Sequence, residues 1–191
     1  FHCVSAMSNA ETLRTERLLL RPIRETDLPV IARRVNDPRI ARNLSRVPWP
    51  YTPDHALAFY GYVRRLDRGE AVFAIVADDR AGPIGLAGYE RLASLPGAEV
   101  GYWLTASAWS RGYATEAARA VVDHAFETAG HDLLRSRCLL RNHASRRVLE
   151  KCGFRFTGIG RCHVASLGCA PPSQDYELLR REWLRQRLER R

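Results

Sequence analysis

The spacing of apolar residues changes midway along the chain, and this change limits the folds that the sequence can adopt. Two early segments, residues 26–36 and 52–66, repeat apolar residues every three or four positions, as amphipathic helices do. Residues 71–104 instead hold three short apolar runs divided by turns, the pattern of an antiparallel meander. Around these segments the sequence predicts a strand from residue 15, helices at 110–130 and 142–151, and strands at 134–140, from 154 and at 175–183. The whole pattern predicts a mixed α/β fold.

The length of 191 residues suits one domain, and 46% hydrophobic residues allow a core of ordinary size. We expect the domain to span residues 15–183, with an N-terminal extension at 1–14 and a basic tail at 184–191. Because Met7 is the only methionine, we expect the native protein to begin there. No apolar run approaches the roughly 18 residues of a membrane-spanning helix, so we expect no membrane segment.

The chain is basic, with 30 lysine and arginine residues against 21 aspartate and glutamate residues and a net charge of +9. Only Lys151 among the basic residues is lysine. Surfaces that bind nucleic acids usually mix the two residue types, and net charge describes solubility and non-specific attraction rather than fold. We therefore do not expect a nucleic-acid partner, although the arginine-rich tail keeps an RNA- or ribosome-binding module as an alternative.

The cysteines follow no metal-binding pattern. The chain has an odd number of them and no recognisable secretory signal, which fits a reducing compartment and predicts a cytoplasmic protein without disulfides. None of the usual zinc spacings occurs, so we expect no metal. The five residues are Cys3, Cys138, Cys152, Cys162 and Cys169.

A junction between a strand and a helix is the most informative local feature. The strand of residues 98–104 ends, a short loop follows, and a helix opens at Gly112. The first amides of a helix lack intrahelical partners and carry the positive end of its dipole, so they suit a phosphate or pyrophosphate. Gly112 and Ala114 are small enough for close approach, and Arg111 adds charge. The segment matches neither a Walker loop nor a GxGxxG dinucleotide turn.

A second segment, residues 141–156, reads RNHASRRVLEKCGFRF. Together the two segments resemble the GNAT superfamily of acetyl-CoA-dependent N-acetyltransferases, in the branch of the ribosomal-protein N-acetyltransferases RimJ and RimL. Trp109 stands where the family's phosphate loop usually has glutamine or arginine, as is frequent in that branch. The resemblance covers about residues 15–183, and four of its motifs occur in order at residues 99–103, 112–117, 142–154 and 175–183.

The resemblance implies a GNAT-type fold, whose central, mostly antiparallel sheet splays between two strands to hold acetyl-CoA. The pyrophosphate is then expected on the loop amides and the pantetheine arm along the strand backbone, with Asn142 as helix cap and ligand. No metal is needed, because the donor thioester is already activated. The implied cofactor-binding residues are Trp103, Leu104, Arg111, Gly112, Tyr113, Ala114, Thr115 and Asn142.

Candidate catalytic residues follow from the chemistry of amine acetylation. The amine must lose a proton before it attacks, and Glu99 is the candidate base; the alternative is a solvated carboxylate at a strand end. Ser145 is the candidate donor to the departing thiolate; the alternative is a first-turn residue that bonds free helix amides. Trp49 and Tyr51 are candidates for the wall of the acceptor pocket, or they anchor the core.

The predicted function is transfer of acetyl from acetyl-CoA to a primary amine, with a protein N-terminus as the leading acceptor, by direct attack in a ternary complex. One alternative is acetylation of a small amine such as an antibiotic, a polyamine or an amino-acid derivative. Another is an RNA-binding or acetyl-CoA-sensing protein without catalysis. The resemblance also implies a homodimer, for which edge strands and residues 167–179 are the candidate contacts.

Overall fold

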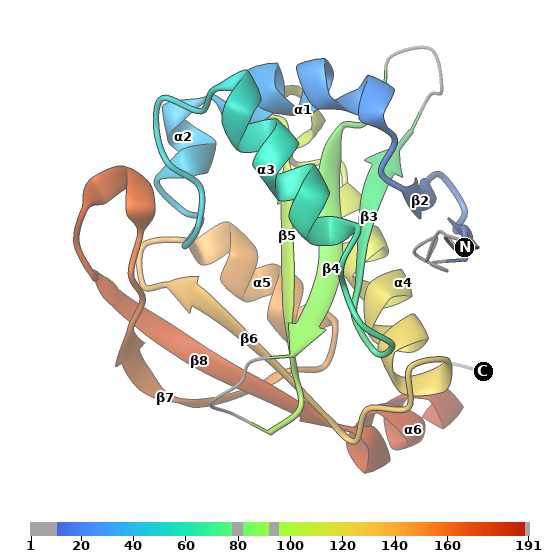
Figure 1. Cartoon of the computed structure of the whole chain (residues 1–191). Helices are drawn as coiled ribbons and strands as arrows, with labels where there is room; N and C mark the ends of the chain where they lie inside the picture. Colours follow the sequence, from blue (N-terminus) through green and yellow to red (C-terminus); the bar gives the residue numbers. More distant parts are fainter. Residues whose placement is uncertain (1–10, 78–81, 92–95, 190–191) are drawn as a thin grey trace.

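Eight strands form one sheet in the computed structural model, which describes residues 11–77, 82–91 and 96–189 (Figure 1). The order across the sheet is β1-β2-β3-β4-β5-β6-β8-β7. All neighbouring strands are antiparallel except β5 and β6, which run parallel. This mixed, mostly antiparallel sheet confirms the predicted fold class. The strands are β1 (Leu13–Arg14), β2 (Leu19–Pro22), β3 (Ala71–Val76), β4 (Gly85–Arg91), β5 (Ala98–Leu104), β6 (Leu133–Leu139), β7 (Arg155–Arg161) and β8 (Pro172–Leu179).

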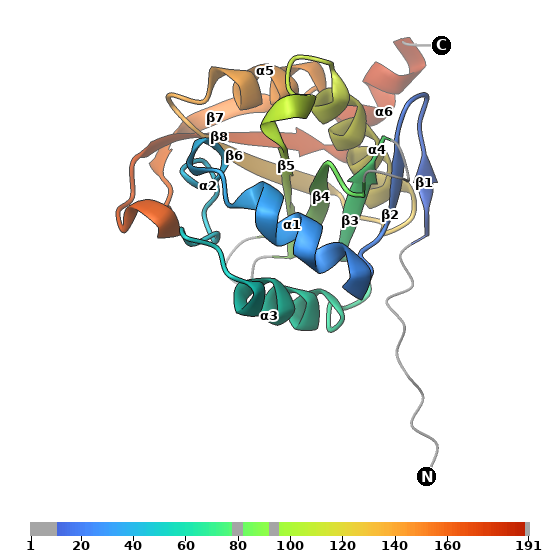
Figure 2. The same ribbon diagram turned by 90° about the horizontal axis from the view of Figure 1, so that it is seen from above.

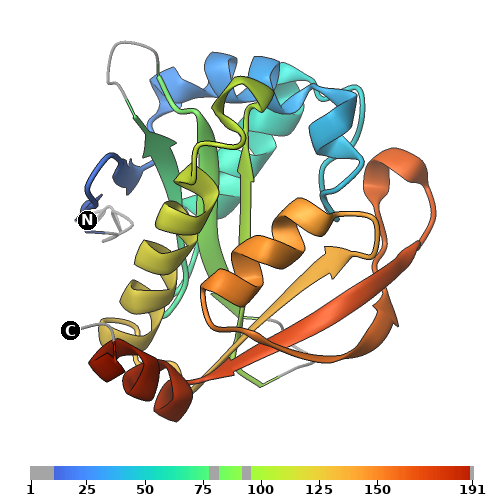
Figure 3. The same ribbon diagram turned by 180° about the vertical axis from the view of Figure 1, so that it is seen from behind.

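Helices cover both faces of the sheet (Figures 2 and 3). Helices α1 and α3 cover one face, with the short α2 between them in sequence, and α4 and α5 cover the other. Helix α6 continues from β8. Most of the predicted N-terminal extension, Met7 included, lies outside the described residues, as do residues 190–191. The helices are α1 (Leu28–Val35), α2 (Pro38–Ala41), α3 (Pro53–Val63), α4 (Tyr113–Glu127), α5 (His143–Lys151) and α6 (Arg180–Glu189).

Polar side chains fix where two helices begin, and the cap at Asn142 was expected from the sequence. The hydroxyl of Thr52 accepts a hydrogen bond from the backbone N–H of His55 at the start of α3, over 3.4 Å. Asn142 accepts from the backbone N–H of Ser145 at the start of α5, over 3.1 Å. Each cap satisfies an amide that has no partner inside its helix.

The last predicted strand is shorter than expected. It was predicted to reach Trp183, but β8 ends at Leu179 and α6 follows at once. Trp183 accounts for the difference: its ring centroid lies 5.1 Å from that of Phe126, and its indole N–H donates to Asp123 over 2.6 Å. Burial of this large side chain against α4 stabilises a helix whose own sequence is strongly polar.

Apolar side chains form two cores, one on each face of the sheet. Strand β3 is buried throughout and contributes to both, because successive side chains point to opposite faces. Phe73 and Ile75 join the core beneath α4 and α5. Val72 and Ala74 join the core beneath α1 and α3. The sheet is therefore a central layer, covered on both sides.

Strands β5 and β6 pair over a short stretch and then separate. Their register consists of Ala98 opposite Leu134 and Glu99 opposite Arg135. Beyond this point the hydroxyl of the buried Ser136 donates to the carbonyl of Val100 over 2.8 Å. The rest of β5 faces an opening in the middle of the sheet.

Candidate active site

A cleft of about 1160 Å³ occupies the opening between β5 and β6. Its walls include the second half of β5, the loop before α4, the start of α5 and the segment between α1 and α3. Most of the predicted site residues line it. Of those that the structure describes, Trp49 and Arg111 are outside the lining. The predicted residues in the lining are Tyr51, Glu99, Trp103, Leu104, Gly112, Tyr113, Ala114, Thr115, Asn142 and Ser145.

The cleft extends through the sheet from one face to the other. Side chains of β5 alternate between faces, so Tyr102 packs with the core beneath α4 while Trp103 packs with the core beneath α1 and α3. Both residues line the cleft. A ligand in it can therefore contact groups from both layers of helices.

The loop before α4 presents backbone amides at one end of the cleft. Gly112 caps α4 in a left-handed conformation with φ +81°, which glycine adopts without strain. Ser110 is also left-handed, with φ 59°. The first-turn amides, at Tyr113 to Thr115, have no carbonyl in a preceding turn and suit an anionic group.

Trp109 holds this loop against β5. Its indole N–H donates to the carbonyl of Leu104 over 2.8 Å. The guanidinium of Arg39 lies 5.7 Å from the centre of the Trp109 ring. Trp109 therefore uses its one side-chain hydrogen-bond donor within the protein.

Basic side chains dominate the charged lining. On α5, His143, Arg147 and Lys151 follow at intervals of four residues, which places them along one side of that helix. This row was not predicted from the sequence, although its four-residue spacing can be seen there. The other basic lining residues are Arg39, Arg42, Arg46, His55, Arg137 and Arg141, against the two carboxylates Glu90 and Glu99.

Glu99 lies partly buried in the cleft on the face of α1 and α3. Burial raises the pKa of its carboxyl above the ordinary value. The charges of Arg137 and Arg46 oppose this rise, and those of Glu90 and Asp175 add to it. A carboxylate in such a setting is suited to take a proton from an amine.

Glu90 was not among the site residues predicted from the sequence. It is 8% exposed and lies directly opposite Glu99 in the β4–β5 register. Its carboxylate accepts from Arg46 over 2.6 Å and from the hydroxyl of Tyr62 over 3.0 Å. The alternation of residues along two adjacent strands is the signal that could have paired Glu90 with Glu99.

Ser145 at the start of α5 is held from two sides. Its backbone N–H is the group capped by Asn142, and its hydroxyl shares a hydrogen bond of 3.0 Å with the hydroxyl of Tyr102. The Tyr102 hydroxyl also lies 3.2 Å from the Ser145 carbonyl. Burial raises the pKa of Tyr102 far above its ordinary value, so this phenol stays protonated. Tyr102 was not predicted as a partner of Ser145, because the two residues lie far apart in the sequence.

The two predicted acceptor-pocket aromatics differ in position. Tyr51 is 8% exposed, packs in the core beneath α1 and α3 and lines the cleft. Burial raises its pKa to about 12. Trp49 is 51% exposed. Core anchoring and contact with the cleft thus coexist at Tyr51.

The described residues contain neither a metal-binding group nor a membrane-spanning helix. Within residues 11–77, 82–91 and 96–189, His, Cys, Asp and Glu side chains form no group of three that could hold a metal ion. None of the described helices has both the length and the apolar character required to span a bilayer.

Comparisons with known proteins give consistent matches. The model of the acetyltransferase (GNAT) domain matches residues 17–155. A Bacillus licheniformis protein named uncharacterized N-acetyltransferase p20 is 25% identical over 182 residues, which cover 91% of this chain and 98% of that protein. The Vibrio fischeri ribosomal-protein-S5-alanine acetyltransferase has a similar fold, with a TM-score of 0.74 at 19% identity, covering 91% of this chain and 99% of that one. Mycobacterium smegmatis RimJ, solved with CoA-disulfide, gives a TM-score of 0.73 at 22% identity, covering 88% and 86% of the two chains.

Proposed function

Since the chain belongs to the GNAT acetyltransferase family, we propose that it transfers acetyl from acetyl-CoA to the α-amine of a protein N-terminus. The observation that most supports this proposal is the cleft that extends through the sheet. It has helix amides and a basic row on the side of α4 and α5, and a partly buried carboxylate on the side of α1 and α3. A donor and an acceptor can therefore approach β5 from opposite faces and meet at the opening.

The residues of the cleft fit acetyl-CoA. The first-turn amides of α4 suit its pyrophosphate, and Arg147 and Lys151 of the basic row add positive charge on the same face of the sheet. The separated edge of β5 suits the pantetheine arm, because strand backbone there is not paired with β6. When bound, acetyl-CoA supplies an activated thioester.

Glu99 and Ser145 divide the proton handling. Glu99 takes the proton of the acceptor ammonium, so that a neutral amine attacks the acetyl carbonyl. Arg46 and Tyr62 occupy the carboxylate of Glu90, so Glu99 is the carboxylate that faces the acceptor. Ser145 donates a hydrogen bond to the leaving sulfur as negative charge develops there, and the second proton of the attacking nitrogen passes to that sulfur, so the products are the amide and the CoA thiol. In this arrangement the Tyr102 hydroxyl donates to Ser145 Oγ, which leaves the serine proton for the sulfur.

The choice of acceptor rests on acidity and charge. A protein α-amine has a pKa of about 8, against about 10.4 for lysine, so a carboxylate needs less driving force to deprotonate it. The mostly basic lining repels polycations such as polyamines and aminoglycosides. The S5-alanine acetyltransferase, which is similar in fold, is named for an acceptor in a ribosomal protein, and this agrees with the choice.

Acetyl-CoA-dependent thiol release tests this proposal. The acceptors are peptides that begin with alanine, serine, threonine or methionine, together with spermidine, an aminoglycoside and free amino acids. We expect turnover with at least one peptide and little with the polycations. Preferential acetylation of a polycation or a free amino acid would replace the protein N-terminus with a small amine. CoA binding without any turnover across the panel would favour the sensing alternative.

A further inference from the structure

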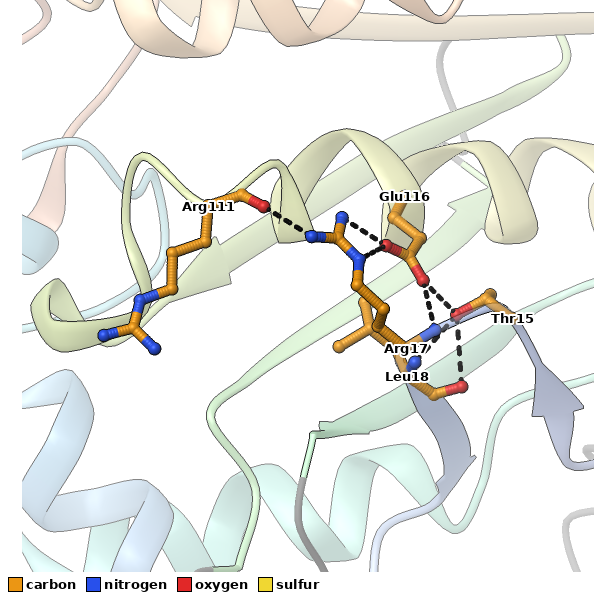
Figure 4. A network of polar contacts seen from close by, with 5 residues as sticks. All are labelled: Thr15, Arg17, Leu18, Arg111 and Glu116. Atoms are coloured by element: carbon orange, nitrogen blue, oxygen red, sulfur yellow. Dashed lines mark hydrogen bonds and ion pairs between the residues drawn. The ribbon is translucent and has the colours of Figure 1, made fainter.

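A network of polar contacts joins the turn between β1 and β2 to the start of α4 (Figure 4). Arg17 lies in this turn. Its guanidinium donates to the carbonyl of Arg111 over 2.9 Å, and to the carboxylate of Glu116 over 2.8 and 2.6 Å. The backbone N–H of Arg17 also donates to Glu116, over 2.8 Å. One side chain thus links the loop to the first turn of α4.

Thr15 and Tyr113 complete the network. The Thr15 hydroxyl donates to Glu116 over 2.6 Å and accepts from the backbone N–H of Leu18 over 2.9 Å. The Arg17 guanidinium lies 4.9 Å from the centre of the Tyr113 ring. Burial alone would raise the pKa of Glu116, but the bonds from Thr15 and Arg17 outweigh it and hold that pKa below its ordinary value. Glu116 is therefore ionised near neutral pH, and both of its carboxylate oxygens accept hydrogen bonds.

The contact with the Arg111 carbonyl orients the peptide group that precedes α4. In a trans peptide the C=O and the following N–H point in opposite directions. With the Arg111 carbonyl turned toward Arg17, the N–H of Gly112 points away from Arg17. Arg17 also stands close behind the loop, since a Cβ added at Gly112 would lie 3.2 Å from its guanidinium.

The charges of Arg17 and Glu116 offset each other within the network. Glu116 by itself would repel a phosphate at the start of α4, and Arg17 removes that repulsion. The pair therefore has little net charge, and its remaining contribution is the geometry of the loop.

We propose that Arg17, fixed by Glu116 and Thr15, is a positioning residue that holds the loop of residues 110–112 in its phosphate-binding conformation. The turn between β1 and β2 is then part of the donor site, although its residues lie outside the cleft lining given above. This inference rests on the proposed use of acetyl-CoA and deepens it.

Comparing two donors tests the proposal. Acetyl-pantetheine carries the same thioester as acetyl-CoA but lacks the pyrophosphate. For Arg17→Met we expect KM for acetyl-CoA to rise about tenfold or more, with kcat at saturation nearly unchanged. With acetyl-pantetheine, kcat/KM should stay within about twofold of the wild-type value. Arg14→Met, an exposed arginine of the same hairpin, is the matched control and should change neither donor.

The double variant Arg17→Met/Glu116→Gln separates positioning from charge compensation. If Arg17 only neutralised Glu116, removing both charges would restore the KM for acetyl-CoA; we expect no restoration. Restoration, an equal loss with both donors, or no loss at all would each overturn the proposal. Thermal denaturation of each variant shows whether it is folded.

Calorimetric titration with CoA alone separates this proposal from the proposed function. If Arg17→Met weakens CoA binding although no acceptor is turned over, the positioning role stands and the proposed reaction fails. If the enzyme acetylates peptides and Arg17→Met binds CoA as the wild type does, the reaction stands and the positioning role fails.

Discussion

Glu90 and Glu99 lie directly opposite each other on β4 and β5, so two carboxylates share one face of the sheet inside the cleft. Like charges at such positions are unfavourable, and the repulsion adds to the rise in the pKa of Glu99. Arg46 and Tyr62 bind Glu90 and leave Glu99 to the cleft. One member of the pair thus has structural partners, and the other is the proposed base.

The pH profile should report Glu99. A base must be ionised, and burial raises the pKa of this carboxyl, so kcat/KM should rise with pH through an apparent pKa above the ordinary 4.5. Arg137 lowers that pKa, so Arg137→Gln should move the acidic limb to higher pH. Glu99→Gln should lower kcat by about 10²-fold or more and remove the limb. A profile that keeps its acidic limb in Glu99→Gln would assign the base elsewhere.

Loss of the Tyr102 hydroxyl should lower kcat more than it changes KM. Tyr102→Phe removes the bond that orients the Ser145 hydroxyl, so we expect kcat to fall about tenfold and KM for acetyl-CoA to stay within about twofold. In the Ser145→Ala background the same change should have little further effect. Tyr176→Phe, which loses a hydroxyl bonded to Gln174, is the control. Independent, additive losses from Tyr102 and Ser145 would contradict this role.

Gly101 offers a way to fill the cleft without disturbing the sheet. It faces the cleft between Glu99 and Trp103, and an added Cβ would meet no atom within 4 Å. Because Gly101 lies on the same face of β5 as Glu99, we expect Gly101→Val to raise KM for the acceptor about tenfold or more while changing the free energy of unfolding by less than about 0.5 kcal/mol. Steady-state kinetics with varied acceptor and urea denaturation measure the two effects.

Gly88, the cross-strand partner of Gly101, is the matched control. A Cβ there would lie 2.3 Å from the carbonyl oxygen of Ala71. Gly88→Ala should therefore destabilise the protein by about 1–3 kcal/mol. If Gly101→Val destabilised the sheet as much as Gly88→Ala, the open space above Gly101 would not be part of a binding cleft.

The buried ion pair between Arg21 and Asp27 should make the free energy of unfolding depend on pH in the acidic range. Both side chains are less than 10% exposed, and two N–H···O contacts of 2.7 and 2.9 Å join them. Burial alone would raise the pKa of Asp27, but hydrogen bonds and charges from Arg21 and Arg24 outweigh it, and the pKa lies below 3.8. Asp27→Asn should cost about 3–5 kcal/mol near neutral pH, since it removes the charge of the carboxylate that binds the buried Arg21.

This cost should shrink in acid. Because the folded-state pKa of Asp27 is depressed, its stabilising contribution is complete above the unfolded-state pKa and is lost as pH falls through the folded-state value. Urea denaturation of both proteins at neutral and strongly acidic pH measures the difference. An unfolding free-energy difference that does not change with pH would exclude this linkage.

Local rules explain why much of the fold could be predicted. The caps at Thr52 and Asn142 and the left-handed glycine at Gly112 act over a few residues, so their effects are visible in the sequence. The insertion of β8 between β6 and β7 and the change to helix at Arg180 depend on contacts between distant segments. Periodicity alone contains no such information.

The candidate site divides in the same way. Glu99, Ser145 and the amide loop belong to continuous motifs, so they could be proposed from the sequence, and they line the cleft. Tyr102 becomes informative only when β5 stands beside α5, and Arg17 only when the first hairpin reaches α4. These partners belong to other elements of the fold, so the sequence motifs alone could not pair them with the site.

The separated edge of β5 has a consequence for solubility. An unpaired strand edge normally recruits strands from other molecules, and proteins protect such edges by covering or shortening them. Here the edge lies within a cleft between two layers of helices rather than at the rim of the sheet. In the proposed binding mode the pantetheine arm lies along this edge, and the walls of the cleft restrict the approach of another polypeptide strand. The fold thus keeps a site for main-chain hydrogen bonding without offering a template for aggregation.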